Sequence, residues 1–64
     1  MTWAEAVLLS NRVRAVGGWV ASPVLNADGC TFHVEVADVG NFEEPLEWLM
    51  VVSDEGAREA GVPF

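Results

Sequence analysis

His33 and Glu35 are the residues whose types and spacing could support catalysis or metal binding. Glu35 follows the only histidine by two positions, so both side chains lie on one face if this segment is a strand. A histidine–carboxylate pair can bind a metal or act in general acid–base catalysis. Zinc sites need three or four protein ligands, and Cys30 would lie on the opposite face of such a strand. We therefore interpret His33 and Glu35 as a solvated strand face with a weak ion pair, and expect neither a metal nor a cofactor.

Cys30, the only cysteine, is the second candidate for chemistry. A reactive thiolate needs a nearby cation or helix N-terminus, whereas the nearest charged neighbour in the sequence, Asp28, is an anion. The Gly17-Gly18 pair precedes a predicted strand, so it cannot present a helix N-terminus to a phosphate. The sequence has no lysine or tyrosine, and we predict a protein that is not an enzyme. The alternative is a minor enzyme or metal-binding domain around His33 that is completed by a partner's residues.

A helix and a hairpin should position these residues. Thr2 and Glu5 match the capping box that begins a helix, and Gly17-Gly18 ends it. Apolar residues at helical spacing form the stripe of this helix: Ala6, Leu9, Val13 and Val16. Two strands follow at 19–25 and 31–37, joined by a turn at 26–29. Pro23 marks the first of them as an edge strand or one broken by a bulge.

The segment 46–52 is ambiguous, because Trp48, Met50 and Val52 alternate as in a strand while other residues fit a helical stripe. The pair of β-branched valines favours a third strand. A polar loop at 38–45 precedes it, and Ser53 should cap a last helix at 54–61. The predicted fold is therefore a single α+β domain over residues 1–64, with the order α-β-β-β-α and helices packed on an antiparallel sheet.

Composition limits the remaining possibilities. A chain of 64 residues forms one small domain, and its 52% hydrophobic content argues against disorder. A single cysteine excludes an intramolecular disulfide. The N-terminus does not match a signal peptide, and the longest uncharged stretch, 15–27, is shorter than a membrane span. We expect a cytoplasmic protein without membrane contact.

The acidic residues are concentrated in one part of the chain. The formal net charge is −7, and nine of the ten acids lie from Asp28 onward. Such a chain is repelled by phosphate backbones, so we expect no direct nucleic-acid binding but attraction to a basic protein surface. Solubility is the simpler explanation of the charge, but it explains the uneven distribution less well. The acids that we expect to bind a partner are Glu43, Glu44, Glu47, Asp54, Glu55 and Glu59.

Three tryptophans are a large aromatic content for this length. We expect at least two of Trp3, Trp19 and Trp48 to lie in the core, since each can bury about 150–250 Å². An exposed tryptophan would indicate a contact with a partner or with a second copy. Small domains often gain stability by association, so a homodimer is possible.

With these features the whole chain resembles the small acidic inhibitor proteins of phages and mobile elements, such as anti-CRISPR proteins and DNA mimics. The resemblance lies in a short, acidic, cysteine-poor chain without a catalytic motif, and it rests on no shared motif. It implies binding to a CRISPR effector or another nucleic-acid-binding complex in the cytoplasm of a bacterial host.

Two hypotheses follow. In the first, the protein is a non-enzymatic inhibitor that binds the basic surface of such a complex, with Trp48 or Phe42 as an apolar anchor. In the second, it is a small structural or assembly protein that acts through homo- or hetero-oligomerisation, and its charge serves solubility.

Overall fold

The computed structural model describes residues 1–39 and 47–64. The chain begins with α1 (Trp3–Val16), which carries the predicted capping box. The Thr2 hydroxyl accepts a hydrogen bond from the Glu5 backbone N–H (3.2 Å), and the Glu5 carboxylate accepts one from the Thr2 N–H (2.8 Å). Gly17 follows the helix with φ of 83°, a conformation that glycine adopts without strain. Local sequence signals therefore set both ends of α1.

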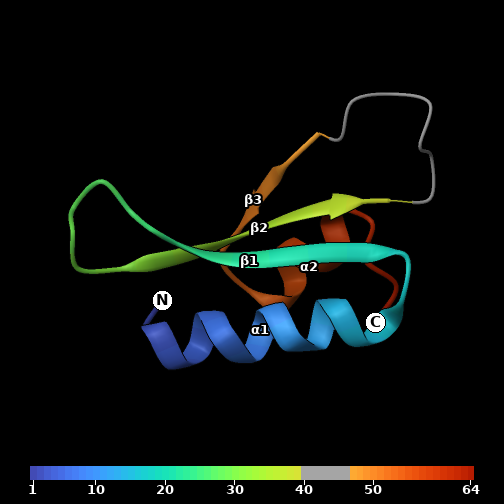
Figure 1. The fold of residues 1–64 in the computed structure, drawn as a ribbon, viewed down its shortest axis with the longest axis horizontal. Coiled ribbons are helices and arrows are strands. Elements are labelled where there is room, and N and C mark those ends of the chain that lie inside the picture. The colour runs from blue at the N-terminus through green and yellow to red at the C-terminus, as the bar shows by residue number, and fades with distance from the viewer. Residues whose placement is uncertain (40–46) are drawn as a thin grey trace.

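Three antiparallel strands form one sheet in the order β1-β2-β3: β1 (Trp19–Leu25), β2 (Phe32–Asp38) and β3 (Leu49–Val51) (Figure 1). The ambiguous segment 46–52 thus contains a strand, as favoured, although the strand is only three residues long. β1 is an edge strand and keeps a regular register with β2 through Pro23, which pairs with Val34. The prediction of an edge strand is confirmed.

The hairpin between β1 and β2 closes through the side chain of Asp28. Its carboxylate accepts hydrogen bonds from the backbone N–H groups of Cys30 (2.8 Å) and Thr31 (2.9 Å) and from the Thr31 hydroxyl (2.6 Å). Thr31 therefore belongs to the turn, and β2 both starts and ends one residue later than predicted, so that Asp38 belongs to the strand and not to the predicted loop. Cys30 is exposed in this turn and lies outside the strand.

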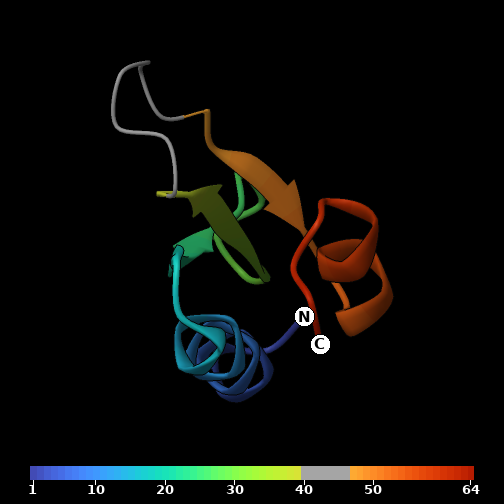
Figure 2. The same cartoon turned by 90° about the vertical axis from the view of Figure 1, so that its right-hand side faces the viewer.

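The short helix α2 (Asp54–Glu59) begins at its predicted cap, where the Ser53 hydroxyl accepts a hydrogen bond from the Gly56 N–H (3.0 Å). The helix ends two residues earlier than predicted because Gly61 adopts a φ of 110° and turns the chain. Figure 2 shows α1 and α2 on the same side of the sheet. The α+β architecture predicted from the sequence is confirmed.

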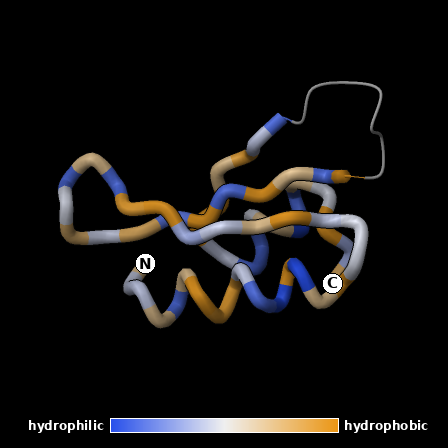
Figure 3. Tube along the Cα trace, in the orientation of Figure 1, coloured by the Kyte–Doolittle hydropathy of each residue, from blue (hydrophilic) through white to orange (hydrophobic). Residues whose placement is uncertain are grey.

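The core lies between the two helices and the sheet. Along α1, polar and apolar positions alternate with the turns of the helix (Figure 3), and Val16 of the predicted stripe is only partly buried. Val34 and Val36 fill the centre of the sheet and are fully buried. The other members of the core cluster are Ala6, Leu9, Val13, Ala21, Val51, Ala57 and Val62. Among the described helices, none is long and apolar enough to cross a membrane.

The tryptophans occupy other positions than expected. Trp19 packs against the core, whereas Trp3 and Trp48 are exposed. The expectation that at least two would lie in the core is therefore wrong. The core positions of α1 and β1 include the small residues Ala6 and Ala21, whereas Trp3 and Trp48 fall at exposed positions.

Candidate functional site

The strand β3 exposes alternate residues on the side of the sheet that no described helix covers. Leu49 and Val51 contribute to the core, while Trp48 and Met50 are 48% and 69% exposed. This follows from the period of two along a strand. The exposed residues Glu47, Trp48 and Met50 together form what we call the β3 surface.

Three carboxylates near β3 in the chain form no hydrogen bond or ion pair with other described side chains. Glu47, Glu55 and Glu59 are exposed, and their carboxylates hydrogen-bond to no other described residue. Glu47 lies before β3, and the other two lie on α2 after it. Glu55 and Glu59 are one helical turn apart, about 6 Å along the axis. Their mutual repulsion is slightly unfavourable for the helix, while Glu55 in the first turn also interacts favourably with the helix dipole.

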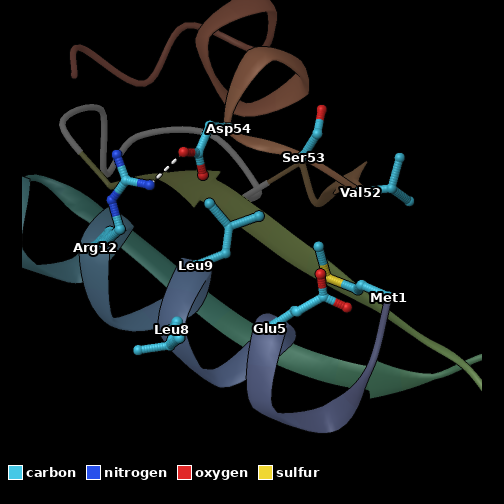
Figure 4. Close-up of a pocket in the computed structure, with 8 residues that line it drawn as sticks. All are labelled: Met1, Glu5, Leu8, Leu9, Arg12, Val52, Ser53 and Asp54. Atoms are coloured by element: carbon cyan, nitrogen blue, oxygen red, sulfur yellow. Dashed lines mark hydrogen bonds and ion pairs between the residues drawn. The ribbon is translucent and has the colours of Figure 1, made fainter.

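Asp54, by contrast, holds two elements together. Its carboxylate forms an ion pair with the guanidinium of Arg12 in α1, and Figure 4 shows the two side chains pointing toward one another. Both side chains are about half exposed, at 50% for Arg12 and 44% for Asp54. The structure therefore separates Asp54 from Glu47, Glu55 and Glu59 among the described acids expected to bind a partner.

Most acids outside this region also have structural contacts. Asp28 closes the hairpin, and its hydrogen bonds from Thr31, foremost the one from the hydroxyl, lower its pKa to about 2. Glu5 caps α1, and the backbone N–H of Thr2 holds the pKa of its carboxyl below the ordinary value. Glu35 contacts His33. The charge of these residues is thus explained by the turn, the helix cap and the sheet.

The three other residues predicted from the sequence to bind a partner, Phe42, Glu43 and Glu44, lie outside the described residues. Of the predicted set, the structure places Glu47 and Trp48 at the start of β3 and Glu55 and Glu59 beyond its end. Met50 was missed by the sequence analysis. Its position two residues after Trp48 indicates that both side chains lie on the same face if the segment is a strand.

All three arginines contact neighbours within the fold. Arg14 donates from Nε to the backbone carbonyl of Ala21 (3.0 Å). Arg58 donates to the carbonyl of Phe64 (3.0 Å), and its guanidinium lies 5.7 Å from the centre of the Phe64 ring. The guanidinium of Arg12, which pairs with Asp54, lies 4.9 Å from the centre of the same ring. None of these contacts involves the carboxylates of Glu47, Glu55 or Glu59.

His33 has a structural position. Its ring is buried, at 8% exposure for the residue, and each ring nitrogen has a partner. Nδ1 lies within hydrogen-bonding distance of Asn26 Oδ1, and Nε2 lies 3.1 Å from Glu35 Oε2. The predicted contact with Glu35 is present, but the prediction of a solvated position is wrong, because the His33 ring is buried and its Nδ1 contacts Asn26 of the hairpin. Among the described residues, no three His, Cys, Asp or Glu side chains come together as a metal site.

A groove of about 320 Å³ runs between α1 and the junction of β3 with α2 (Figure 4). Leu8 and Val52 line it and are both exposed, and the Arg12–Asp54 pair lies at one end. Leu8 falls outside the helical stripe that the sequence indicates, which is the reason it was not singled out. The groove is open and its lining mixes apolar and charged groups.

No protein-family model, curated protein or solved structure matches this chain. The interpretation of the site therefore rests on its own residues.

Proposed function

We propose that this protein is a non-enzymatic inhibitor that binds a basic surface of a nucleic-acid-handling protein complex and blocks it, in the manner of an anti-CRISPR protein or DNA mimic. The observation that supports this proposal is the separation of the acids into two groups. Glu5, Asp28, Glu35 and Asp54 make contacts within the fold. The carboxylates of Glu47, Glu55 and Glu59 have no hydrogen-bonding or ion-pair partner among the described residues, and Glu47 is next to the exposed Trp48 in the chain.

The mechanism has two steps. The acidic region first attracts a basic surface at long range, which raises the rate of association and makes that rate sensitive to salt. Trp48 then becomes buried against the partner. Tryptophan is enriched among the residues that contribute most to binding energy, and an indole that is already half buried loses little conformational freedom on binding.

The proposed partner is a protein and not a nucleic acid. A net charge of −7 repels phosphate groups, while a surface built to bind DNA or RNA offers the arginines and lysines that carboxylates attract. A CRISPR effector complex is one such partner. This function places the protein in the cytoplasm of a bacterial host.

A charge-matched pair of variants tests the proposal. The first variant carries Glu47→Gln, Glu55→Gln and Glu59→Gln. The second loses the same charge elsewhere, through Glu5→Gln, Asp28→Asn and Glu35→Gln. Wild type and both variants are used to capture proteins from a nuclease-treated bacterial lysate at low and high salt, after circular dichroism has shown that each variant is folded.

We expect wild type and the second variant to capture a nucleic-acid-binding protein at low salt, and the first variant to lose it. Wild type should also prevent the purified partner from binding its nucleic acid. Equal capture by both variants would contradict a specific role for Glu47, Glu55 and Glu59. Capture without any effect on nucleic-acid binding would contradict inhibition.

The alternative function is that of a small structural or assembly protein that acts through homo- or hetero-oligomerisation. The exposed Leu8 and Val52 at the groove support it, since apolar side chains gathered at one place often mark a contact surface. Sedimentation at low and high salt separates the two functions. A tight oligomer that persists in both conditions supports assembly, and a monomer at high concentration supports the inhibitor.

A further inference from the structure

The hydrogen-bond pattern of the sheet shows which backbone groups are free at its edges. Asn26 donates its backbone N–H to the Thr31 carbonyl (2.8 Å), and Val39 donates to the Gly18 carbonyl (3.0 Å). In an antiparallel pair, backbone groups point toward the partner strand at every second residue. The even-numbered residues of β1 therefore bond to β2. The odd-numbered residues, Pro23 among them, point their backbone groups away from the sheet.

The same alternation continues into β3. The odd-numbered residues of β2 direct their backbone N–H and C=O groups toward β1. The backbone groups of Val34 and Val36 therefore point toward β3 and bond to their partners Val51 and Leu49. Met50 lies between these bonded pairs, so its N–H and C=O point outward. Phe32 confirms the pattern, because its N–H donates in the β3 direction to the Met1 carbonyl (2.8 Å).

The two edges of the sheet differ in how they are protected. At the β1 edge, Pro23 lies at an outward position and has no backbone N–H to donate. The outward carbonyl of Ala21 already accepts a hydrogen bond from Arg14 Nε. Proline and charged side chains on an edge strand prevent the addition of further strands. At the β3 edge, no described residue hydrogen-bonds to the outward groups of Met50. Pro23 and Arg14 thus block the β1 edge near its centre, and no such protection is present at Met50 among the described residues.

We propose that the outer edge of β3 accepts an extended basic segment of the partner protein as a fourth strand. This inference rests on the proposed function and names how the partner is held. Backbone groups of Met50 would supply the hydrogen bonds, as in other cases of strand addition. Trp48 and Met50 would contact alternate side chains of the added segment on one face, since the period of a strand is two residues.

Charge decides the chemistry of the added strand. Glu47 lies before β3 in the chain, and Glu55 and Glu59 lie after it on α2; no described residue hydrogen-bonds to these three carboxylates. Lysine or arginine at every second position of the segment would satisfy these carboxylates while apolar residues meet Trp48. A second copy of this chain is a poor occupant, because each copy carries a net charge of −7 and like charges at an interface oppose association.

Two substitutions of Met50 test the backbone contact. Met50→Pro removes the outward N–H, and the fold should tolerate it because Pro23 occupies the equivalent outward position in β1. Met50→Thr is the matched control, which removes the long side chain but keeps the N–H in a residue suited to strands. The probe is a synthetic eight-residue peptide of alternating lysine and valine, titrated by calorimetry at low salt.

We expect Met50→Pro to weaken binding of the peptide about tenfold, the equivalent of one lost hydrogen bond, and Met50→Thr to weaken it less. Amide hydrogen exchange of the wild type gives a measurement that needs no substitution. The peptide should slow exchange at Met50 and leave Leu25, an outward residue of β1, unchanged.

Equal binding by the two variants together with unchanged exchange at Met50 would overturn the inference. So would exchange at Met50 that slows with protein concentration in the absence of peptide, because the occupant would then be a second copy. The proposed function is decided separately by the glutamine variants described above. If a partner requires the three glutamates but binds the Met50→Pro variant normally, the inhibitor function stands and the inference of an added strand is wrong.

Discussion

Arg12 and Asp54 are 42 positions apart in the chain, and their ion pair joins the middle of α1 to the first residue of α2. Asp54 also lies at the N-terminus of α2, where a negative charge interacts favourably with the helix dipole. Two structural roles thus account for one of the acids in the cluster at residues 43–59. The neighbouring Glu55 shares the first turn of α2 but forms no ion pair with a described residue.

Removing the Asp54 charge should affect stability more than binding. We expect Asp54→Asn to lower the free energy of unfolding by at most about 1 kcal/mol, because both partners are half exposed to water and salt. Glu55→Gln should leave stability within about 0.5 kcal/mol of wild type. Urea unfolding at low salt measures both. A larger loss for Glu55→Gln than for Asp54→Asn would contradict this division of roles.

The centre of the sheet should be sensitive to the loss of volume. Val36 is fully buried beside Leu49 of β3, and Val36→Ala should lower the free energy of unfolding by about 2 kcal/mol. That is a large share of the stability of so small a domain. The matched control is Val52→Ala at an exposed position, which should change stability by less than about 0.5 kcal/mol. Similar losses for both would mean that the core lies elsewhere.

The hairpin turn should weaken in acid. The hydrogen bonds from Thr31 lower the pKa of Asp28 from its ordinary 3.8 to about 2 in the folded protein. A depressed pKa means that the unfolded chain binds the proton more readily, so the contribution of this carboxylate is present above pH 4 and is lost as the pH falls toward 2.

Urea unfolding between pH 5 and pH 2 should therefore show a decrease in stability that Asp28→Asn reduces. The amide resonances of Cys30 and Thr31, which donate to this carboxylate, should shift over the same pH range. If Asp28→Asn keeps the same pH dependence as wild type, other carboxylates are responsible.

The two exposed tryptophans should differ in function. Trp3 packs edge-to-face on Phe32 with ring centres 5.3 Å apart, so Trp3→Ala should lower stability by about 1 kcal/mol or more. Trp48→Ala should leave stability nearly unchanged and weaken partner binding by about 2 kcal/mol, as for a residue at the centre of an interface. Unfolding and binding measurements on both variants test the difference. If Trp48→Ala lowers stability but leaves partner binding unchanged, Trp48 is not part of the binding site.

The local elements could be predicted because their signals lie within a few residues of one another. The capping box of Thr2 and Glu5 spans four residues, and the Asp28 turn closes over a similar distance. β3 was harder, since a short apolar segment fits both periods until a neighbouring strand is present. Val34 and Val36 supply that neighbour.

The sequence by itself determined the two helix caps, the hairpin, the α+β class and the strong excess of acidic charge, all of which depend on neighbouring residues or on composition. Only the tertiary structure decided which acids are engaged, which tryptophans are exposed, that His33 is buried, and that β3 is the open edge. Each of these depends on residues distant in the chain, such as Arg12 beside Asp54 and Asn26 over His33. Contacts of this kind are set by how the helices pack on the sheet, and no local pattern in the sequence encodes that packing.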